Sequence, residues 1–367
     1  MPTIESHGSA APVPVPPISD EDGEFEALPP IPVQALKQPS GPPDEPPIVD
    51  ETTGRAWQPR LLLLLILLGF GLRMAYVRQI DTPPFSDMAD YEAMALNLLE
   101  GRGLIMSDLY KAYRPPLYPL MIAGVYRFFG TRPDSVLLIQ CVLSALTVAL
   151  AYLFTFHLFQ LRERGRQAPQ EGPTPGALAI RARSIALVAA ALLCFEEATI
   201  FFCGQLLTET LFTFLFVTWA YLTVKGATRP SLGWATLIGI VGGAAILTRP
   251  NFAPLVLAGA YWFFLRSRRH FSPPPPDWHR FSFIESPYAP PLVMVTYAFL
   301  VVSLWTIRNQ TVLDQFVLVS TNGGVNFYLG HHEDFGYASF GDKEGIRMRL
   351  RERGSYDEVL ESKIFTL

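Results

Sequence analysis

The sequence predicts an all-α protein that crosses a membrane about seven times. Half of its 367 residues are hydrophobic and only 17% are charged, which is too apolar for an ordinary soluble domain. Several apolar runs also approach the roughly 20 residues that a helix needs to cross a hydrocarbon core. The net charge of -4 reflects acidic residues near the N-terminus, and nothing in the chain indicates nucleic-acid binding.

Residues 1–55 form a tail rich in proline and acidic residues. The segment has neither helical nor strand periodicity, so it cannot bury enough apolar surface to offset the entropy lost on ordering. We therefore expect it to be disordered. The first apolar run begins only at Leu61, too late for a cleavable secretory signal, and it is interpreted as an uncleaved anchor.

Seven apolar segments are interpreted as membrane spans, of which the third and the sixth are short. They are residues 59–77, 136–159, 184–202, 206–224, 232–248, 252–265 and 292–307. Arginine and lysine gather in the loops at one side of this arrangement, which the positive-inside rule assigns to the cytoplasm. The sequence therefore predicts a cytoplasmic N-terminus, a membrane domain over 56–307, a first outer loop over 78–135 and an outer C-terminal segment over 308–367.

A short amphipathic helix is predicted in the first outer loop, within FSDMADYEAMALNLLEGRG. Apolar residues from Met88 to Leu99 recur at helical spacing, which is typical of a helix lying in the membrane surface. Gly101 and Gly103 are expected to end it. The proline pair at 115–116 then turns the chain back toward the bilayer.

The first turn of this helix carries two aspartates, Asp87 and Asp90, that have two interpretations. Ser86 or Asp87 can cap the helix by accepting hydrogen bonds from its first free amides. Alternatively, a carboxylate at this place can act as a general base. The two roles are compatible, and the residues alone leave both open.

Charged residues at the predicted outer ends of the spans are further candidates. Arg249, in LTRPN, and Arg308 lie where positive-inside statistics disfavour a cation, and Arg114 precedes the proline pair. Such arginines can bind a lipid phosphate, extend to lipid headgroups, or pair with the acids of the membrane region, which are Glu196, Glu197 and Glu209.

Two other charged residues have competing interpretations. Glu209, in LLTETLF, is either a site residue or an N-terminal helix acid beside a Thr208 cap. Arg73 lies deep in the first span, where an internal partner is expected rather than contact with substrate.

In order along the chain, these stretches resemble bacterial membrane glycosyltransferases of the GT-C fold. The resemblance is to proteins similar to protein mannosyltransferases and aminoarabinose transferases, which are glycosyltransferase family 39-like. It covers about residues 61 to 330 and rests on D-x-x-D-Y, GRG, YRPPLYPLMIAGVYRFFG, LLIQCVLSAL, TET, LTRPN and RNQTVLDQFVLVSTNGGVNFYLG. It implies a sugar donor carried on a polyprenyl phosphate, an acceptor met at the outer leaflet, and a first-loop carboxylate as base.

The resemblance also assigns roles to individual residues. The base falls on Asp87, with Asp90 as the alternative, and Glu209 takes the acid of the later motif. Arg114 takes the position of the basic residue before the proline pair. Together with Arg249 and Arg308 it is the predicted site for the lipid phosphate. The sequence names neither the sugar nor the acceptor, which can be protein, lipid or glycan.

The chain departs from the resemblance near its end. After NFYLG it has His331 and His332 where relatives usually have Asn. Two adjacent histidines without a third spaced ligand do not predict a metal site, and we assign no metal or other cofactor. Relatives generally continue into further spans, so the resemblance implies that the chain is a fragment or a shortened member.

Two other functions fit a membrane protein with charged residues at its spans. One is a transporter or flippase for a lipid-linked sugar, and the other is a noncatalytic assembly subunit. Against transport, the two halves show no internal repeat, and the polar residues gather at one face of the membrane.

Overall fold

The computed structural model describes residues 58–80, 83–164, 175–269 and 286–323. All regular secondary structure in these residues is helical, which confirms the all-α part of the predicted fold class. The elements are α2 (Gln58–Val77), α3 (Asp87–Leu99), α4 (Leu117–Phe129), α5 (Pro133–Arg164), α6 (Pro175–Cys194), α7 (Glu197–Cys203), α8 (Glu209–Gly226), α9 (Leu232–Thr248), the 3-10 turn η2 (Pro250–Phe252), α10 (Ala253–Ser267) and α11 (Ala289–Leu313). The predicted tail over 1–55 lies outside the described residues.

Four of the described helices are long and apolar enough to cross a membrane, where about seven spans were predicted. They are Pro59–Val77, Pro133–Arg162, Gly176–Cys194 and Ala289–Leu313. Leu117–Phe129 and Leu232–Thr248 are shorter apolar helices. At 1.5 Å per residue, α9 with its 17 residues is about 26 Å long, which is below the thickness of a hydrocarbon core of about 30 Å.

The bounds predicted for the third span are wrong. The apolar run continues through 184–202, but α6 begins earlier, at Pro175, and ends at Cys194, and a separate helix α7 follows. Glu196 caps α7, because its carboxylate accepts hydrogen bonds from the backbone N–H of Ala198 at 3.2 Å and of Thr199 at 2.6 Å. A carboxylate at this position also opposes the positive end of the helix dipole.

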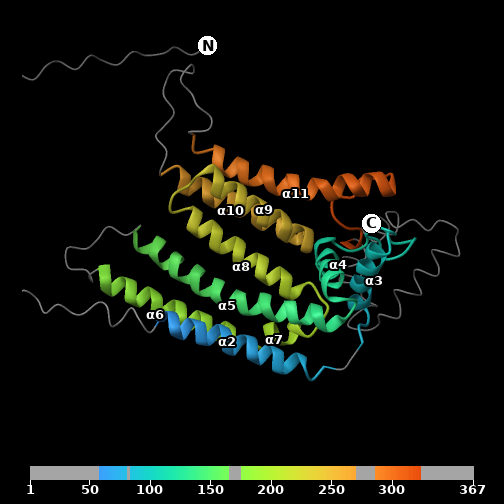
Figure 1. Ribbon diagram of the computed structural model, residues 1–367. Coiled ribbons are helices and arrows are strands. Elements are labelled where there is room, and N and C mark those ends of the chain that lie inside the picture. The colour runs from blue at the N-terminus through green and yellow to red at the C-terminus, as the bar shows by residue number, and fades with distance from the viewer. Residues whose placement is uncertain (1–57, 81–82, 165–174, 270–285, 324–367) are drawn as a thin grey trace, which may run out of the picture. The chain divides into compact units, whose positions relative to one another are not determined.

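The long helices pack as neighbouring layers. α5 contacts α2 and α6 on one side and α8 on the other, α8 contacts α9, and α9 contacts α11, as Figure 1 shows. Gly239 and Gly243 permit the close approach of α9 to α11, because a Cβ at Gly239 would collide with the carbonyl oxygen of Met294 and one at Gly243 with Val301. Small residues four apart commonly allow helices in membranes to approach in this way.

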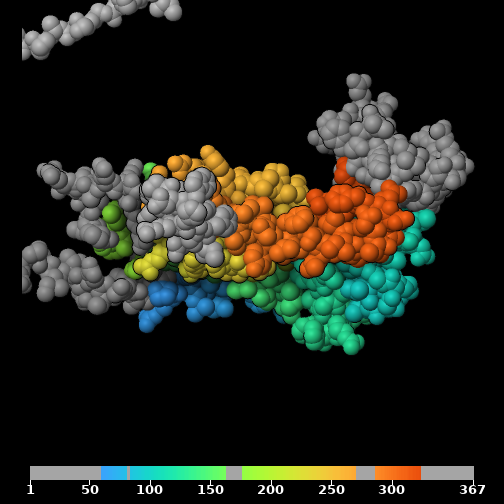
Figure 2. All heavy atoms as spheres, turned by 90° about the horizontal axis from the view of Figure 1, so that it is seen from above, coloured from blue at the N-terminus to red at the C-terminus, as the bar shows by residue number. Residues whose placement is uncertain are grey.

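The short helices α3 and α4 lie at the end of the bundle where α2, α9 and α11 finish and where α5 and α8 begin (Figure 1). Figure 2 shows the α11 face, with the teal residues of this region at one end. The amphipathic helix predicted at this place is confirmed. Its apolar side, however, packs on protein rather than lying free on a membrane surface, since Tyr91 and Ala95 share a buried cluster with Tyr118 and Ile122 of α4.

Candidate functional site

Arg114 brings the two predicted aspartates together. Its Nη2 lies 2.5 Å from Oδ1 of Asp87 and 2.7 Å from Oδ2 of Asp90, and its Nε donates a hydrogen bond to the same Asp90 oxygen at 3.2 Å. The side chain of Arg114 is 10% exposed, whereas those of Asp87 and Asp90 are 42% and 28% exposed. One guanidinium therefore serves two carboxylates that lie three residues apart on one side of α3.

The capping interpretation of this turn is wrong. Ser86 stands at the N-cap of α3, but its side chain makes no capping hydrogen bond. Its φ of 51° is uncommon for a residue other than glycine. The carboxylate of Asp87 is bonded to Arg114 instead.

Two tyrosine rings enclose the guanidinium of Arg114. Its Cζ lies 5.5 Å from the ring centre of Tyr91 and 5.2 Å from that of Tyr113, within the range of cation–π attraction. Burial raises the pKa of Tyr91 to about 12, with the charge of Asp87 adding to the shift and that of Arg114 opposing it. The phenol is therefore protonated at neutral pH and can donate a hydrogen bond.

A second cluster joins the start of α8 to the end of α9. Nη2 of Arg249 lies 2.5 Å from Oε1 of Glu209, and its Nε donates to Oγ1 of Thr208 at 3.0 Å. The side chain of Thr208 makes no capping hydrogen bond to α8, so the interpretation of Thr208 as a cap is wrong. Of the interpretations left open for Arg249, the structure shows pairing with Glu209.

The loop before α8 is held in place from α5. The side-chain amide nitrogen of Gln140, Nε2, donates to the backbone oxygens of Cys203 at 3.0 Å and Gln205 at 2.9 Å. Its Oε1 accepts a hydrogen bond from the hydroxyl of Tyr118 at 2.8 Å. Gln140 thus fixes the position of Glu209 relative to both α4 and α5.

The two clusters lie around one phenol. Besides the charges of its own cluster, the pKa of Tyr91 responds to those of Glu209 and Arg249. Tyr91 also meets Tyr118 edge to face at 5.2 Å, and both belong to a buried apolar cluster with Leu211 of α8. Five of the six predicted site residues are therefore near each other. Tyr91 itself was missed, although it stands directly after Asp90 in the motif.

Residues 179–277, from α6 to beyond α10, match the family model described as dolichyl-phosphate-mannose-protein mannosyltransferase. Over these residues the chain is similar to that family. The resemblance seen in the sequence and the prediction of a membrane glycosyltransferase are thereby confirmed. No curated protein and no solved structure matches the chain.

The mannosyltransferase match includes the second cluster and excludes the first. Glu209 and Arg249 fall within it, whereas Asp87, Asp90 and Arg114 precede it. Together with the four helices of spanning length, the match makes the chain a multi-pass membrane protein.

Arg308 supports the fold at another place, outside the matched residues. Its Nη1 donates to the backbone oxygen of Lys111 at 2.7 Å and its Nη2 to that of Leu104 at 3.1 Å, while its Cζ lies 4.5 Å from the ring centre of Trp305. Arg308 therefore holds the loop between α3 and α4 against α11. These contacts place it with the loop backbone rather than with the two clusters.

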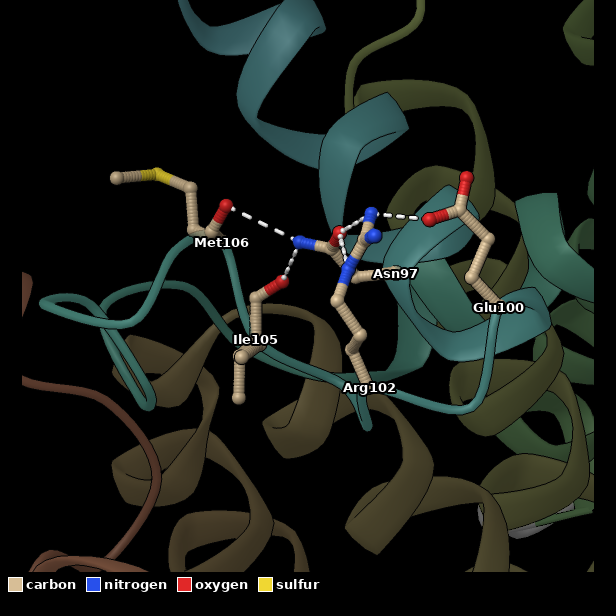
Figure 3. A network of polar contacts seen from close by, with 5 residues as sticks. All are labelled: Asn97, Glu100, Arg102, Ile105 and Met106. Atoms are coloured by element: carbon tan, nitrogen blue, oxygen red, sulfur yellow. Dashed lines mark hydrogen bonds and ion pairs between the residues drawn. The ribbon is translucent and has the colours of Figure 1, made fainter.

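A polar network fixes the start of the same loop (Figure 3). Nδ2 of Asn97 donates to the backbone oxygens of Ile105 at 2.8 Å and Met106 at 3.2 Å, and its Oδ1 accepts from Nε of Arg102 at 2.9 Å. Arg102 also pairs with Glu100. The GRG stretch thus positions the loop that leads to Arg114.

Arg73 is fully buried and has internal partners, as expected. Those partners are uncharged. They are the hydroxyls of Ser144 and Thr199 and the backbone oxygens of Gly69, Leu193 and Cys194, at 2.6 to 3.2 Å. Leu193 and Cys194 end α6, so Arg73 satisfies carbonyls that have no partner within that helix.

Within the described parts of the chain, no group of three or more potential ligands can hold a metal ion. His331 and His332 lie outside those parts. The three cysteines are buried as free thiols.

Proposed function

We propose that the chain transfers a sugar from a polyprenyl-phosphate donor to an acceptor at the outer face of the cell membrane, with Asp87 as the base. The supporting observation is the cluster in which Arg114 faces both Asp87 and Asp90, because two carboxylates against one cation leave a negative charge that can accept a proton. Asp87 is the better base of the two. It is more exposed, and it makes one contact with Arg114 where Asp90 makes two.

The proposed step is a displacement at the anomeric carbon. The acceptor oxygen forms a bond to that carbon while the bond from carbon to the phosphate oxygen breaks, and the phosphate leaves with the electron pair. Asp87 takes the proton of the acceptor hydroxyl on the face opposite the leaving group, as in inverting sugar transfer.

The leaving phosphate needs positive charge, and Arg249 is the more available donor. Its side chain is 35% exposed, compared with 10% for Arg114, and its Nη1 has no partner among the described residues. A guanidinium can engage phosphate oxygens through two parallel hydrogen bonds. Arg114, beside the ring of Tyr91, contributes a second positive charge. Arg308 has a smaller part, because its donors already bind loop carbonyls.

Turnover of radiolabelled polyprenyl-phosphate mannose by the purified full chain tests the proposal. Release of free polyprenyl phosphate, dependent on an acceptor and absent in Asp87→Asn, is expected. Movement of the intact donor across a vesicle membrane without cleavage would instead favour a flippase.

The proposed orientation has its own test. The basic loops favour a cytoplasmic N-terminus, with α3, α4 and the two clusters outside. A cysteine at Ser107 should then react with an impermeant thiol reagent added to intact cells. Labelling only after permeabilisation would contradict this orientation.

A further inference from the structure

An open apolar groove of about 440 Å³ lies between the last turns of α10 and the first turns of α11. Its wall includes Tyr261 and Phe264 of α10, Tyr288 at the N-cap of α11, and Leu292 and Val295 of α11. All the lining side chains are aliphatic or aromatic, and the tyrosine hydroxyls are their only polar atoms. The volume falls in the range of pockets that hold small ligands, about 300–1,000 Å³.

The groove is open to the membrane at the end of the bundle away from the two arginine clusters. α11 is long enough to cross a membrane, and the groove follows its first two turns over about 10 Å, from Tyr288 to Val295. In Figure 1 these turns lie at the opposite end of α11 from α3 and α4. Tyr261 and Leu292 are 64% and 54% exposed, so lipid chains can reach the wall. An empty hollow would leave these side chains without contacts on one side, and an acyl chain supplies those contacts.

Three arginines stand at the end of the groove. Arg266 lies in the last turn of α10, Arg268 at its C-cap and Arg269 directly after it. The Cζ of Arg268 lies 5.7 Å from the ring centre of Phe264, and Phe264 in turn stacks on Tyr288 at 5.1 Å, so Arg268 is held at the rim. Arg268 and Arg269 are exposed and form no ion pair with the described residues. Their positive charge is therefore available to an anion.

We propose that the groove binds one anionic phospholipid, with an acyl chain along the wall and the phosphate at Arg268 and Arg269. A guanidinium binds phosphate oxygens through paired hydrogen bonds, and basic pockets between membrane helices bind anionic headgroups. A second copy of the chain fits the groove less well, because it would bring the same arginines to the same level and their charges would repel. The polyprenyl-phosphate donor of the proposed function has its phosphate at the opposite end of the bundle, so the lipid proposed here is a different one.

The test measures retained lipid by native mass spectrometry of the full chain. The chain is reconstituted with equal amounts of phosphatidylglycerol and phosphatidylcholine that carry the same acyl chains, and it should retain phosphatidylglycerol in preference. Arg268→Gln combined with Arg269→Gln should lower that preference roughly tenfold or more, the effect of one charge-assisted hydrogen bond. Arg60→Gln is the matched control and should leave the preference unchanged. Arg60 is exposed in the first turn of α2, which begins at the same end of the bundle but across it from α10 and α11 (Figure 1).

A second pair of variants tests the groove itself. Leu292→Trp places a larger side chain in the groove, so it should cause a loss of both retained phospholipids. Leu304→Trp is its control, because Leu304 is an exposed leucine of the same helix that lies outside the groove. It should cause no loss.

None of these measurements depends on sugar transfer. Equal retention of the two phospholipids by the native chain would overturn the inference. The same loss of preference in Arg60→Gln as in the double variant would also overturn it, because the arginines would then act only through general surface charge. Equal effects of Leu292→Trp and Leu304→Trp would show that the groove holds no acyl chain. Displacement of the phospholipid by added polyprenyl phosphate would assign the groove to the donor, and a dimer without bound lipid would assign it to a second copy; either result excludes the proposed occupant.

Discussion

The two arginine clusters differ in charge balance and in exposure. Around Arg114, two carboxylates share one guanidinium whose side chain is 10% exposed. Around Arg249, a single carboxylate faces a guanidinium that is 35% exposed. The first cluster therefore carries one negative charge in excess, and the second is neutral.

This difference suits the first cluster to proton uptake and the second to anion binding. An excess carboxylate beside a buried cation can take up a proton, whereas a neutral pair with an accessible guanidinium can exchange its carboxylate for another anion. The clusters should then respond differently to substitution, and four predictions test whether they do.

The largest effect is expected at Asp87. Asp87→Asn removes the proposed base and keeps the shape of the side chain, so the transfer rate should fall at least about 100-fold while donor binding and thermal stability are retained. Asp90→Asn should have a milder effect. If Asp90→Asn loses activity and Asp87→Asn does not, the roles within the pair are reversed. Normal turnover in both variants would remove the catalytic interpretation.

Arg114→Gln should affect both stability and binding. It leaves two neighbouring carboxylates without their common partner, so the free energy of unfolding should fall by about 1–3 kcal/mol, a range that allows for the partial exposure of both aspartates. Donor affinity should fall by about tenfold. Arg114→Lys should restore part of both. Denaturation curves and donor binding, measured on the same preparations, separate the two effects.

Arg249→Gln should affect donor binding more than stability, in contrast to Arg114→Gln. The pair with Glu209 is more exposed, so the loss of stability should stay below about 1 kcal/mol, while donor affinity again falls by about tenfold. Arg249→Lys should partly restore binding. A loss of stability as large as that of Arg114→Gln, with unchanged donor affinity, would show that Arg249 is only a structural partner of Glu209.

The smallest effect is expected at Tyr91, between the clusters. Its pKa is raised by burial from about 10 to about 12, so the fold favours the protonated phenol. That contribution is complete below about pH 10 and disappears as the pH rises toward 12. Between about pH 10 and pH 12 the Tyr91→Phe variant should therefore lose less stability than the native chain, as measured by thermal melting at each pH. Tyr261→Phe, at an exposed tyrosine of α10, is the control and should follow the native chain.

Several elements could be predicted from hydropathy because they depend on local sequence. The first span, 59–77, agrees with α2 within one residue, and the fifth, 232–248, coincides with α9. Hydropathy failed at 184–202. The run is continuously apolar on both sides of Phe195, and Glu196 was interpreted as an acid within the membrane rather than as the cap of α7.

The candidate site was only partly predictable for a related reason. Motif order indicated Asp87, Arg114, Glu209 and Arg249, but not how they would pair. Arg114 lies 24 residues from Asp90, and Thr208 lies 41 residues from Arg249, so their contacts depend on how the helices pack. Nothing in the local sequence of Arg308 indicates that its donors bind the loop between α3 and α4.

Arg73 has a consequence for the order in which the chain is made. Its partner Ser144 is synthesised 71 residues later, and the carbonyl oxygens at the end of α6 come 120 and 121 residues later. Apart from the carbonyl of Gly69 within α2 itself, the partners of this charge do not yet exist when α2 enters the membrane, at a cost of up to roughly 3 kcal/mol. The leucine run at the start of α2 offsets that cost, since each leucine contributes roughly 0.3 to 0.6 kcal/mol toward insertion. The burial of α2 is thus complete only once α6 and α7 have been synthesised.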